Sequence, residues 1–173
     1  MAYFIELLKI IVPAGLVIYG MYLVIVSFLS KEREAKLITL KTRNSDTVLP
    51  IRLQAAERLC LLLERLTPNN LVRRVNDQAY SARELHSLLL SEIREEFNHN
   101  LAQQVYFSDE AWESVRNAVE GVITLVNRAM QEVNPEAKGM DLAKKIFQLS
   151  LEQKNDGISF ALQKVKSEIR VYF

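Results

Sequence analysis

The chain has 173 residues, of which 49% are hydrophobic and 25% are charged, and its formal net charge is +1 at pH 7. Because 22 basic residues are balanced by 21 acidic ones, and the two kinds alternate along most of the chain, nucleic acid is not an expected partner. Five glycines and a single cysteine leave little material for a phosphate-binding loop or a disulfide framework.

Residues 10–29 form an uncharged run near the N-terminus. As a helix, at about 1.5 Å per residue, this run is roughly 30 Å long, which is the thickness of the apolar core of a bilayer. A cleaved signal peptide is the competing interpretation, but Lys9 is the only early base and no Ala-x-Ala motif follows the run. The sequence therefore predicts a transmembrane signal anchor in residues 1–30, with the lipid bilayer contacted by residues 10–29.

The charges that follow this run predict its orientation. Five bases lie within about fifteen residues of its end: Lys31, Arg33, Lys36, Lys41 and Arg43. Since loops rich in Lys and Arg stay on the cytoplasmic side, we expect the N-terminus outside and the rest of the chain in the cytoplasm. The lone Cys60 agrees with a reducing compartment.

The pattern beyond the membrane run is helical. Residues 31–48 are predicted to be a juxtamembrane helix and linker, interrupted at residues 44–46, where Asn-Ser-Asp weakens the helix. Residues 49–173 are predicted to be a helical domain. Its first helix begins with Pro50 in the first turn and ends before Pro68. Residues 71–80 are compatible with a short helical turn or an extended linker.

Three later helices have recognisable starts. Ser81 and Glu84 have the spacing of a capping box, and the helix that they begin should reach about residue 105. Ser108 is the predicted N-cap of a long amphipathic helix that ends at Pro135. Asp141 is the predicted N-cap of the next helix. An apolar residue recurs every four positions along the first of these helices, which predicts a buried stripe of Leu85, Leu89, Ile93, Phe97 and Leu101.

A break at residues 155–157 precedes the terminal helix, whose predicted buried residues are Ile158, Phe160, Leu162, Val165 and Ile169. The expected fold class is all-α: one N-terminal transmembrane helix followed by a cytoplasmic helical bundle of about five helices.

Residues 95–104, EEFNHNLAQQ, are the segment that most resembles a chemical site. Glu96 and His99 are one helical turn apart, as in the Glu-x-x-His pairs of di-metal bundles, but His86 has no such partner and cannot supply the second pair. Cys60 lies in an apolar run, where a cysteine is usually a buried hydrophobe. We therefore expect no catalytic residue, cofactor or metal, with a metal-binding bundle as an alternative.

Several stretches together resemble a known kind of protein. They are LPIRLQAAERL, ERLTPNNLVRRV, REEFNHNLAQQVYFS and the closing KSEIRVYF, behind a single apolar span. With them the whole chain resembles an uncharacterised family of small bacterial single-span inner-membrane proteins with a helical cytoplasmic domain. The resemblance implies the bacterial inner membrane as location, and it brings no activity, cofactor or catalytic residue.

The expected function is that of a non-enzymatic, membrane-anchored protein-interaction module, an accessory or scaffold subunit of a membrane complex. A homo-oligomeric structural membrane protein is an alternative. Interleaved amides and charges suit a hydrogen-bonded protein contact. The predicted partner-binding residues are Arg65, Asn69, Asn70, Arg73, Arg74, Glu95, Glu96, Asn98, His99, Asn100, Gln103 and Gln104. An equal alternative is that Arg73 or Arg74 pairs with Glu95 or Glu96 inside one chain and joins two helices.

Overall fold

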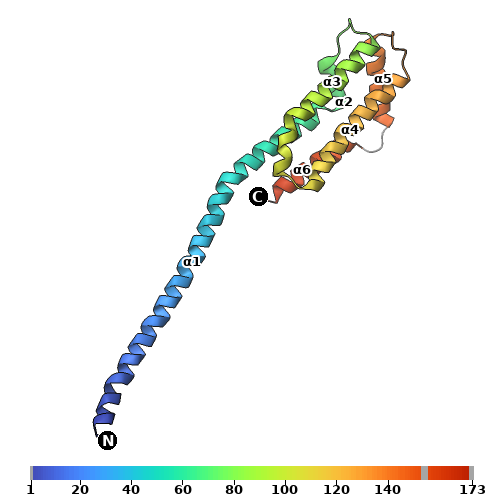
Figure 1. Cartoon of the computed structure of the whole chain (residues 1–173). Helices are drawn as coiled ribbons and strands as arrows, with labels where there is room; N and C mark the ends of the chain where they lie inside the picture. Colours follow the sequence, from blue (N-terminus) through green and yellow to red (C-terminus); the bar gives the residue numbers. More distant parts are fainter. Residues whose placement is uncertain (1, 153–155, 172–173) are drawn as a thin grey trace. The chain divides into compact units, whose positions relative to one another are not determined.

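The computed structural model describes the backbone of residues 2–152 and 156–171, and within it the side chains of residues 15–32, 47–152 and 156–171 (Figure 1). These residues form six α-helices and one 3₁₀ helix, with an isolated bridge between Ser81 and Lys138 in place of any strand. The prediction of an all-α chain is confirmed. The chain divides into two units, residues 1–48 and 49–173, which are described separately below.

The first unit consists of the N-terminal part of helix α1 (Ala2–Arg65). Its segment Gly15–Glu32 is long and apolar enough to cross a membrane, and none of this segment is buried within the protein. The segment overlaps the predicted span of residues 10–29, of which residues 10–14 lie outside the described side chains.

Helix α1 differs from the prediction because it continues through residues 44–46 and through Pro50. Asn, Ser and Asp each lower helix stability by less than about 1 kcal/mol, and the segment contains no glycine. Extending an existing helix costs much less than nucleating a new one, so a few weak residues do not interrupt it. Pro50 removes one backbone N–H from the helix without ending it.

The second unit is built from the end of α1 and the remaining helices. Their bounds are α2 Pro68–Val75, α3 Ala82–Asn100, η1 Leu101–Tyr106 (the 3₁₀ helix), α4 Asp109–Gln131, α5 Gly139–Glu152 and α6 Gly157–Arg170. Residues 71–75 are thus helical, with Pro68 at the first position of α2, where its missing N–H leaves no bond unmade.

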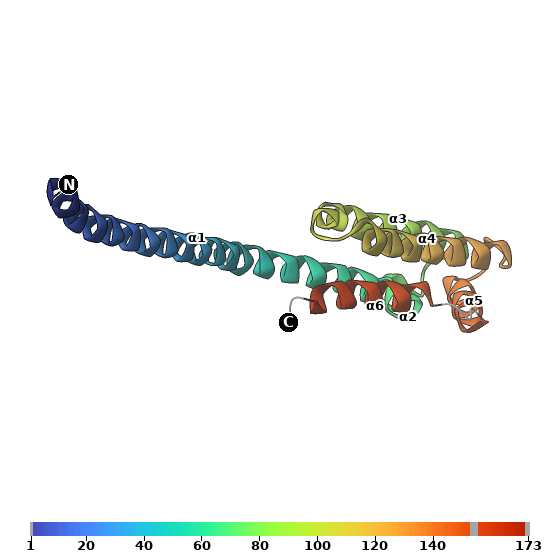
Figure 2. The same ribbon diagram turned by 90° about the horizontal axis from the view of Figure 1, so that it is seen from below.

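These helices form two layers around one apolar core. Figure 2 shows α3 and α4 side by side in one layer, and α2, α6 and the end of α1 in the other, with α5 at one end. Helix α4 packs against α3, α5 and α6. From α1, Leu59, Leu62 and Leu63 are fully buried in this core, as is Leu66 directly after the helix.

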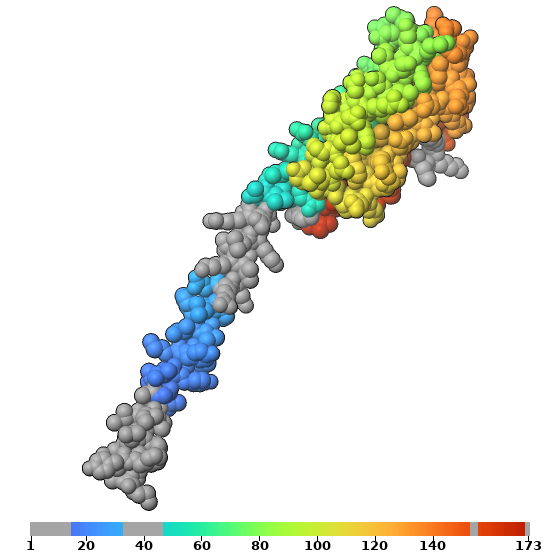
Figure 3. Space-filling model, viewed as in Figure 1, coloured from blue at the N-terminus to red at the C-terminus, as the bar shows by residue number. Residues whose placement is uncertain are grey.

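The contact between α3 and α4 combines apolar and polar pairs. Figure 3 shows the two helices adjoining along one face of the unit. The Phe97 and Trp112 rings stack with their centroids 5.6 Å apart. His86 Nε2 lies 2.9 Å from Asn127 Oδ1, in a hydrogen bond that also joins the two helices.

The backbone N–H groups at the start of α3 are hydrogen-bonded to neighbouring polar groups. Ser81 and Glu84 form the predicted capping box, which is confirmed. The next backbone N–H groups donate to the loop between α4 and α5: Ala82 N to Ala137 O at 2.8 Å and Arg83 N to Pro135 O at 3.1 Å. The free N–H groups of a helix start therefore have partners in the fold.

The same loop explains why α5 begins two residues before the predicted cap. Gly139 N donates to Tyr80 O at 2.8 Å, and a Cβ atom on Gly139 would lie only 3.0 Å from that oxygen. The close approach of two backbones places residue 139 in the helix. The prediction of Asp141 as N-cap is wrong, and Asp141 lies in the first turn.

Two apolar residues of the predicted core are exposed. Phe160 is 55% exposed at the surface of α6, where the Lys164 ammonium lies 5.7 Å from its ring centroid. Leu101 is 38% exposed because α3 changes to the 3₁₀ helix η1 at this residue. The period falls from 3.6 to 3.0 residues per turn there, so the stripe of α3 cannot be extended past Phe97.

Candidate functional site

The predicted site in residues 95–104 spans the end of α3 and the first turn of η1. Glu95, Asn98 and His99 are exposed, whereas Glu96 and Asn100 are half-buried. Gln103 was expected on the polar face, but it is only 9% exposed. The change to 3₁₀ geometry rotates it inward, for the same reason that Leu101 turns outward.

The half-buried carboxylate of Glu96 is the centre of a charge cluster between helices. Arg74 Nη1 of α2 lies 2.9 Å from Glu96 Oε1, and Arg74 Nη2 lies 3.2 Å from Glu92 Oε2. Arg65, the last residue of α1, also pairs with Glu96 Oε1. Arg65, Arg74, Glu92 and Glu96 form what we term the interhelical charge cluster.

This cluster joins three helices through partly shielded charges. The side chain of Glu96 is 16% exposed and that of Arg74 is 30% exposed, so their pairing is less screened by water than that of an open surface pair. One of the two alternatives raised by the sequence, an Arg74–Glu96 contact within one chain, is present in the structure.

Two predicted amide residues stabilise helix ends. Asn70 Nδ2 donates to Glu64 O at 2.9 Å at the end of α1. Asn100 Nδ2 donates to Glu96 O at 2.8 Å at the end of α3. Both side chains thus add a hydrogen bond to a backbone carbonyl group near a helix C-terminus.

The remaining predicted residues are outside the charge cluster. Glu95 accepts a hydrogen bond from Ser91 Oγ within α3. Within the part of the chain whose side chains are described, the other five are exposed and form no side-chain hydrogen bond or ion pair: Asn69, Arg73, Asn98, His99 and Gln104. We term these five the free polar set.

The two histidines have different surroundings. His86 is bonded to Asn127 between α3 and α4, whereas His99 belongs to the free polar set. Within residues 15–32, 47–152 and 156–171, no three His, Cys, Asp or Glu side chains are grouped so that they could hold a metal ion.

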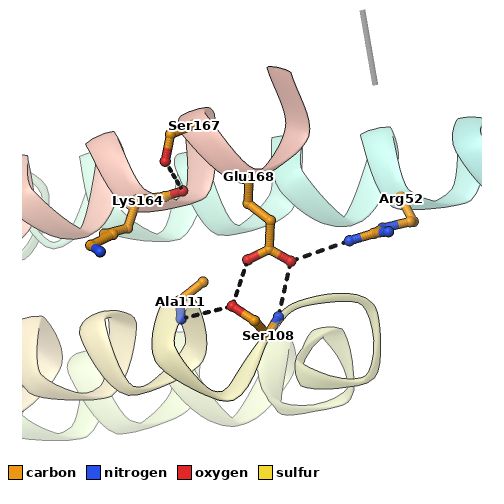
Figure 4. Close-up of polar contacts among 6 residues, drawn as sticks. All are labelled: Arg52, Ser108, Ala111, Lys164, Ser167 and Glu168. Carbon is orange, nitrogen blue, oxygen red and sulfur yellow. Dashed lines mark hydrogen bonds and ion pairs between the residues drawn. The ribbon is translucent and has the colours of Figure 1, made fainter. Parts of the chain in front are cut away.

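A second polar cluster, which the sequence did not predict, joins α1, the start of α4 and α6 (Figure 4). Glu168 of α6 accepts hydrogen bonds from Ser108 N (2.9 Å) and Ser108 Oγ (2.8 Å), and from Arg52 Nη2 of α1 (3.2 Å). Ser108 Oγ also accepts from Ala111 N at 3.2 Å, as the predicted N-cap of α4. The N-cap is a local sequence signal. Its contact with Glu168, 60 residues away, and the contact of Glu168 with Arg52, 116 residues away, have no such signal.

Local surroundings shift the pKa values of several ionisable groups in the second unit. Burial raises the pKa of the Cys60 thiol, although the nearby Lys166 acts in the opposite direction. A raised pKa leaves little thiolate at neutral pH, so Cys60 is a poor nucleophile. The Ser81 hydrogen bonds lower the pKa of Glu84, and pairing with Lys164 and Lys145 lowers the pKa of Glu110 and Glu132.

The sequence was compared with known proteins and with families of proteins. No curated protein and no solved structure matches the chain. One family model matches residues 2–172, which is nearly the entire chain. The chain belongs to the family of unknown function DUF7935.

Proposed function

We propose that this protein is a membrane-anchored protein-interaction module, an accessory or scaffold subunit of a bacterial inner-membrane complex. The observation that supports it most is the double use of α1. The helix contains the apolar segment Gly15–Glu32, and its last turns contribute Leu59, Leu62 and Leu63 to the core of the second unit. A continuous helix of this kind ties a folded unit to the lipid bilayer.

The surface of the second unit supplies the contact residues in this proposal. The free polar set offers the amides of Asn98 on α3, Gln104 on η1 and Asn69 on α2. It also offers the guanidinium of Arg73 and the imidazole of His99. Arginine and amide side chains without internal partners suit a hydrogen-bonded interface. Arg65, Arg74 and Glu96 are assigned instead to holding helices together, because their charges already have partners.

Topology is tested with single cysteines in a Cys60→Ser background. In this proposal the N-terminus is outside and residues 49–173 are in the cytoplasm, because several positive charges follow the span. Ala2→Cys should then react with an impermeant maleimide in intact cells, and Gln78→Cys only after permeabilisation. The reverse pattern would exclude this orientation.

The interaction itself is tested by crosslinking in native membranes followed by mass spectrometry. A photo-crosslinking amino acid at Arg73 or His99 should give crosslinks to other proteins, since both side chains are exposed. Crosslinks between copies of this chain alone would favour a homo-oligomeric structural protein. No protein crosslink from either position would contradict the proposal.

A further inference from the structure

A groove of about 380 Å³ lies between α1 and η1 in the second unit. From α1 it is lined by Ile51, Gln54 and Arg58, and from η1 by Gln103, Val105 and Tyr106. The groove lies where the α-helical geometry of α3 changes to the tighter 3₁₀ geometry of η1, before the N-cap of α4.

The polar groups of this groove are not used by the fold. The amide of Gln103 forms no hydrogen bond with any described residue, although the residue is only 9% exposed. Among the described side chains, Arg58 pairs with no carboxylate, and the Tyr106 hydroxyl has no hydrogen-bond partner. The groove therefore presents unused hydrogen-bond groups beside one positive charge.

Apolar side chains lie at the same place. Val105 is 78% exposed and Ile51 is 42% exposed, at positions lining the groove. Among the residues whose side chains are described, no acidic one lines it. An occupant that complements the groove must bring an apolar group for Val105 and Ile51, and a carboxylate for Arg58.

We propose that this groove binds an acidic amphipathic helix of a partner protein, in which an apolar side chain and a carboxylate lie one helical turn apart. Recognition of helices in grooves uses apolar anchors at such spacing. Anionic lipid is a weaker match, because lipid surfaces are recognised by clusters of several bases, whereas Arg58 is the one base among the described residues that line this groove. The proposal rests on the proposed function and specifies the chemistry of the partner.

The first experiment is a display selection on the full-length protein in detergent, with a library of amphipathic helical peptides randomised in the charge of one position next to the apolar stripe. We expect acidic residues to be enriched at that position. Arg58→Glu should weaken binding of the selected acidic peptides by about tenfold or more, since a favourable charge pair becomes repulsive. Peptides with lysine in place of the acidic residue should bind this variant, because the charge pair is then favourable again.

The controls separate the groove from general charge effects. Arg94→Glu makes the same change of charge on α3, at an exposed residue outside the groove, and should leave peptide binding unchanged. Val105→Asp should abolish binding without unfolding, because the side chain is mostly exposed. Failure to enrich acidic residues, or binding that is insensitive to Arg58→Glu, would overturn the proposal.

A photo-crosslinker at Val105 in native membranes distinguishes the groove from the wider function. Protein crosslinks from position 105 that are lost in Arg58→Glu support the groove. Only lipid adducts, or only links to a second copy of this chain, would overturn it. Protein crosslinks from Arg73 without any from position 105 would remove the groove and leave the proposed function intact.

Discussion

The carboxylate of Glu168 bonds to both the backbone N–H and the hydroxyl of Ser108, so the last helix of the chain is bonded to the cap of α4. The side chain of Glu168 is 20% exposed, and Arg52 of α1 approaches the same carboxylate. One acidic side chain thus connects three segments that are distant in the sequence.

Ser108→Ala should lower the free energy of unfolding by about 1 to 2 kcal/mol, because it removes an N-cap and one hydrogen bond to Glu168. Urea denaturation monitored by circular dichroism measures the change. Ser87→Ala, at an exposed position inside α3, is the matched control and should cost nothing. Equal effects of the two substitutions would contradict the role of Ser108.

Arg74→Ala should destabilise the second unit by about 1 kcal/mol, and the loss should shrink at high salt. The neighbouring Arg73→Ala removes the same charge from the free polar set and should leave stability unchanged. Urea midpoints at low and high ionic strength decide the matter. A larger effect at Arg73 would show that the charge cluster does not hold the helices together.

Gly139→Ala should destabilise the protein by about 1 to 3 kcal/mol, since the added Cβ would lie 3.0 Å from Tyr80 O and must displace a backbone. Gly121→Ala is the matched control, because nothing lies within 4 Å of a Cβ at that position of α4. Alanine favours helices over glycine, so this control should be stabilising by up to about 1 kcal/mol. Thermal denaturation of both variants provides the comparison.

Acid should weaken the fold through Glu84, Glu110 and Glu132. Their pKa values are lowered in the folded protein by bonds to Ser81, Lys164 and Lys145. A lowered folded-state pKa means that the unfolded chain binds protons first as the pH falls. The stabilisation is therefore present above the ordinary glutamate range and is lost as the pH falls through the lowered values. Urea midpoints between neutral pH and about pH 3 should fall less steeply in the triple Glu→Gln variant.

A fragment of residues 47–173 should fold without the membrane segment, because the core leucines of α1 all lie after residue 58. We expect a cooperative unfolding transition and a monomeric elution volume. A molten or aggregated fragment would show that the core needs the first part of α1 or a partner to be completed.

Local signals predicted much of the fold. The capping box of Ser81 and Glu84, the Ser108 cap and the helix ends near Pro68 and Pro135 are confirmed, because each depends on a few neighbouring residues. The break at residues 44–46 is not found, because weak helix formers do not end a helix that is already formed. The exposed positions of Leu101 and Phe160 depend on packing and on the 3₁₀ segment, which periodicity does not detect.

The sites were predictable to a smaller extent. The pairing of Arg74 with Glu96 was one of two alternatives, since spacing within a helix gives its faces and not its neighbours. The contact of Glu168 with Ser108 and Arg52 joins residues 60 and 116 positions apart, and no local pattern marks it. The groove at η1 was missed because it depends on the inward rotation of Gln103.

The bond between Arg52 and Glu168 also has a consequence for biosynthesis. The two residues are separated by 116 positions. During translation the leucines of α1 emerge well before α6, which packs on α4. The core therefore cannot close until α6 has left the ribosome, and until then the apolar surface of α1 and α4 is available to chaperones.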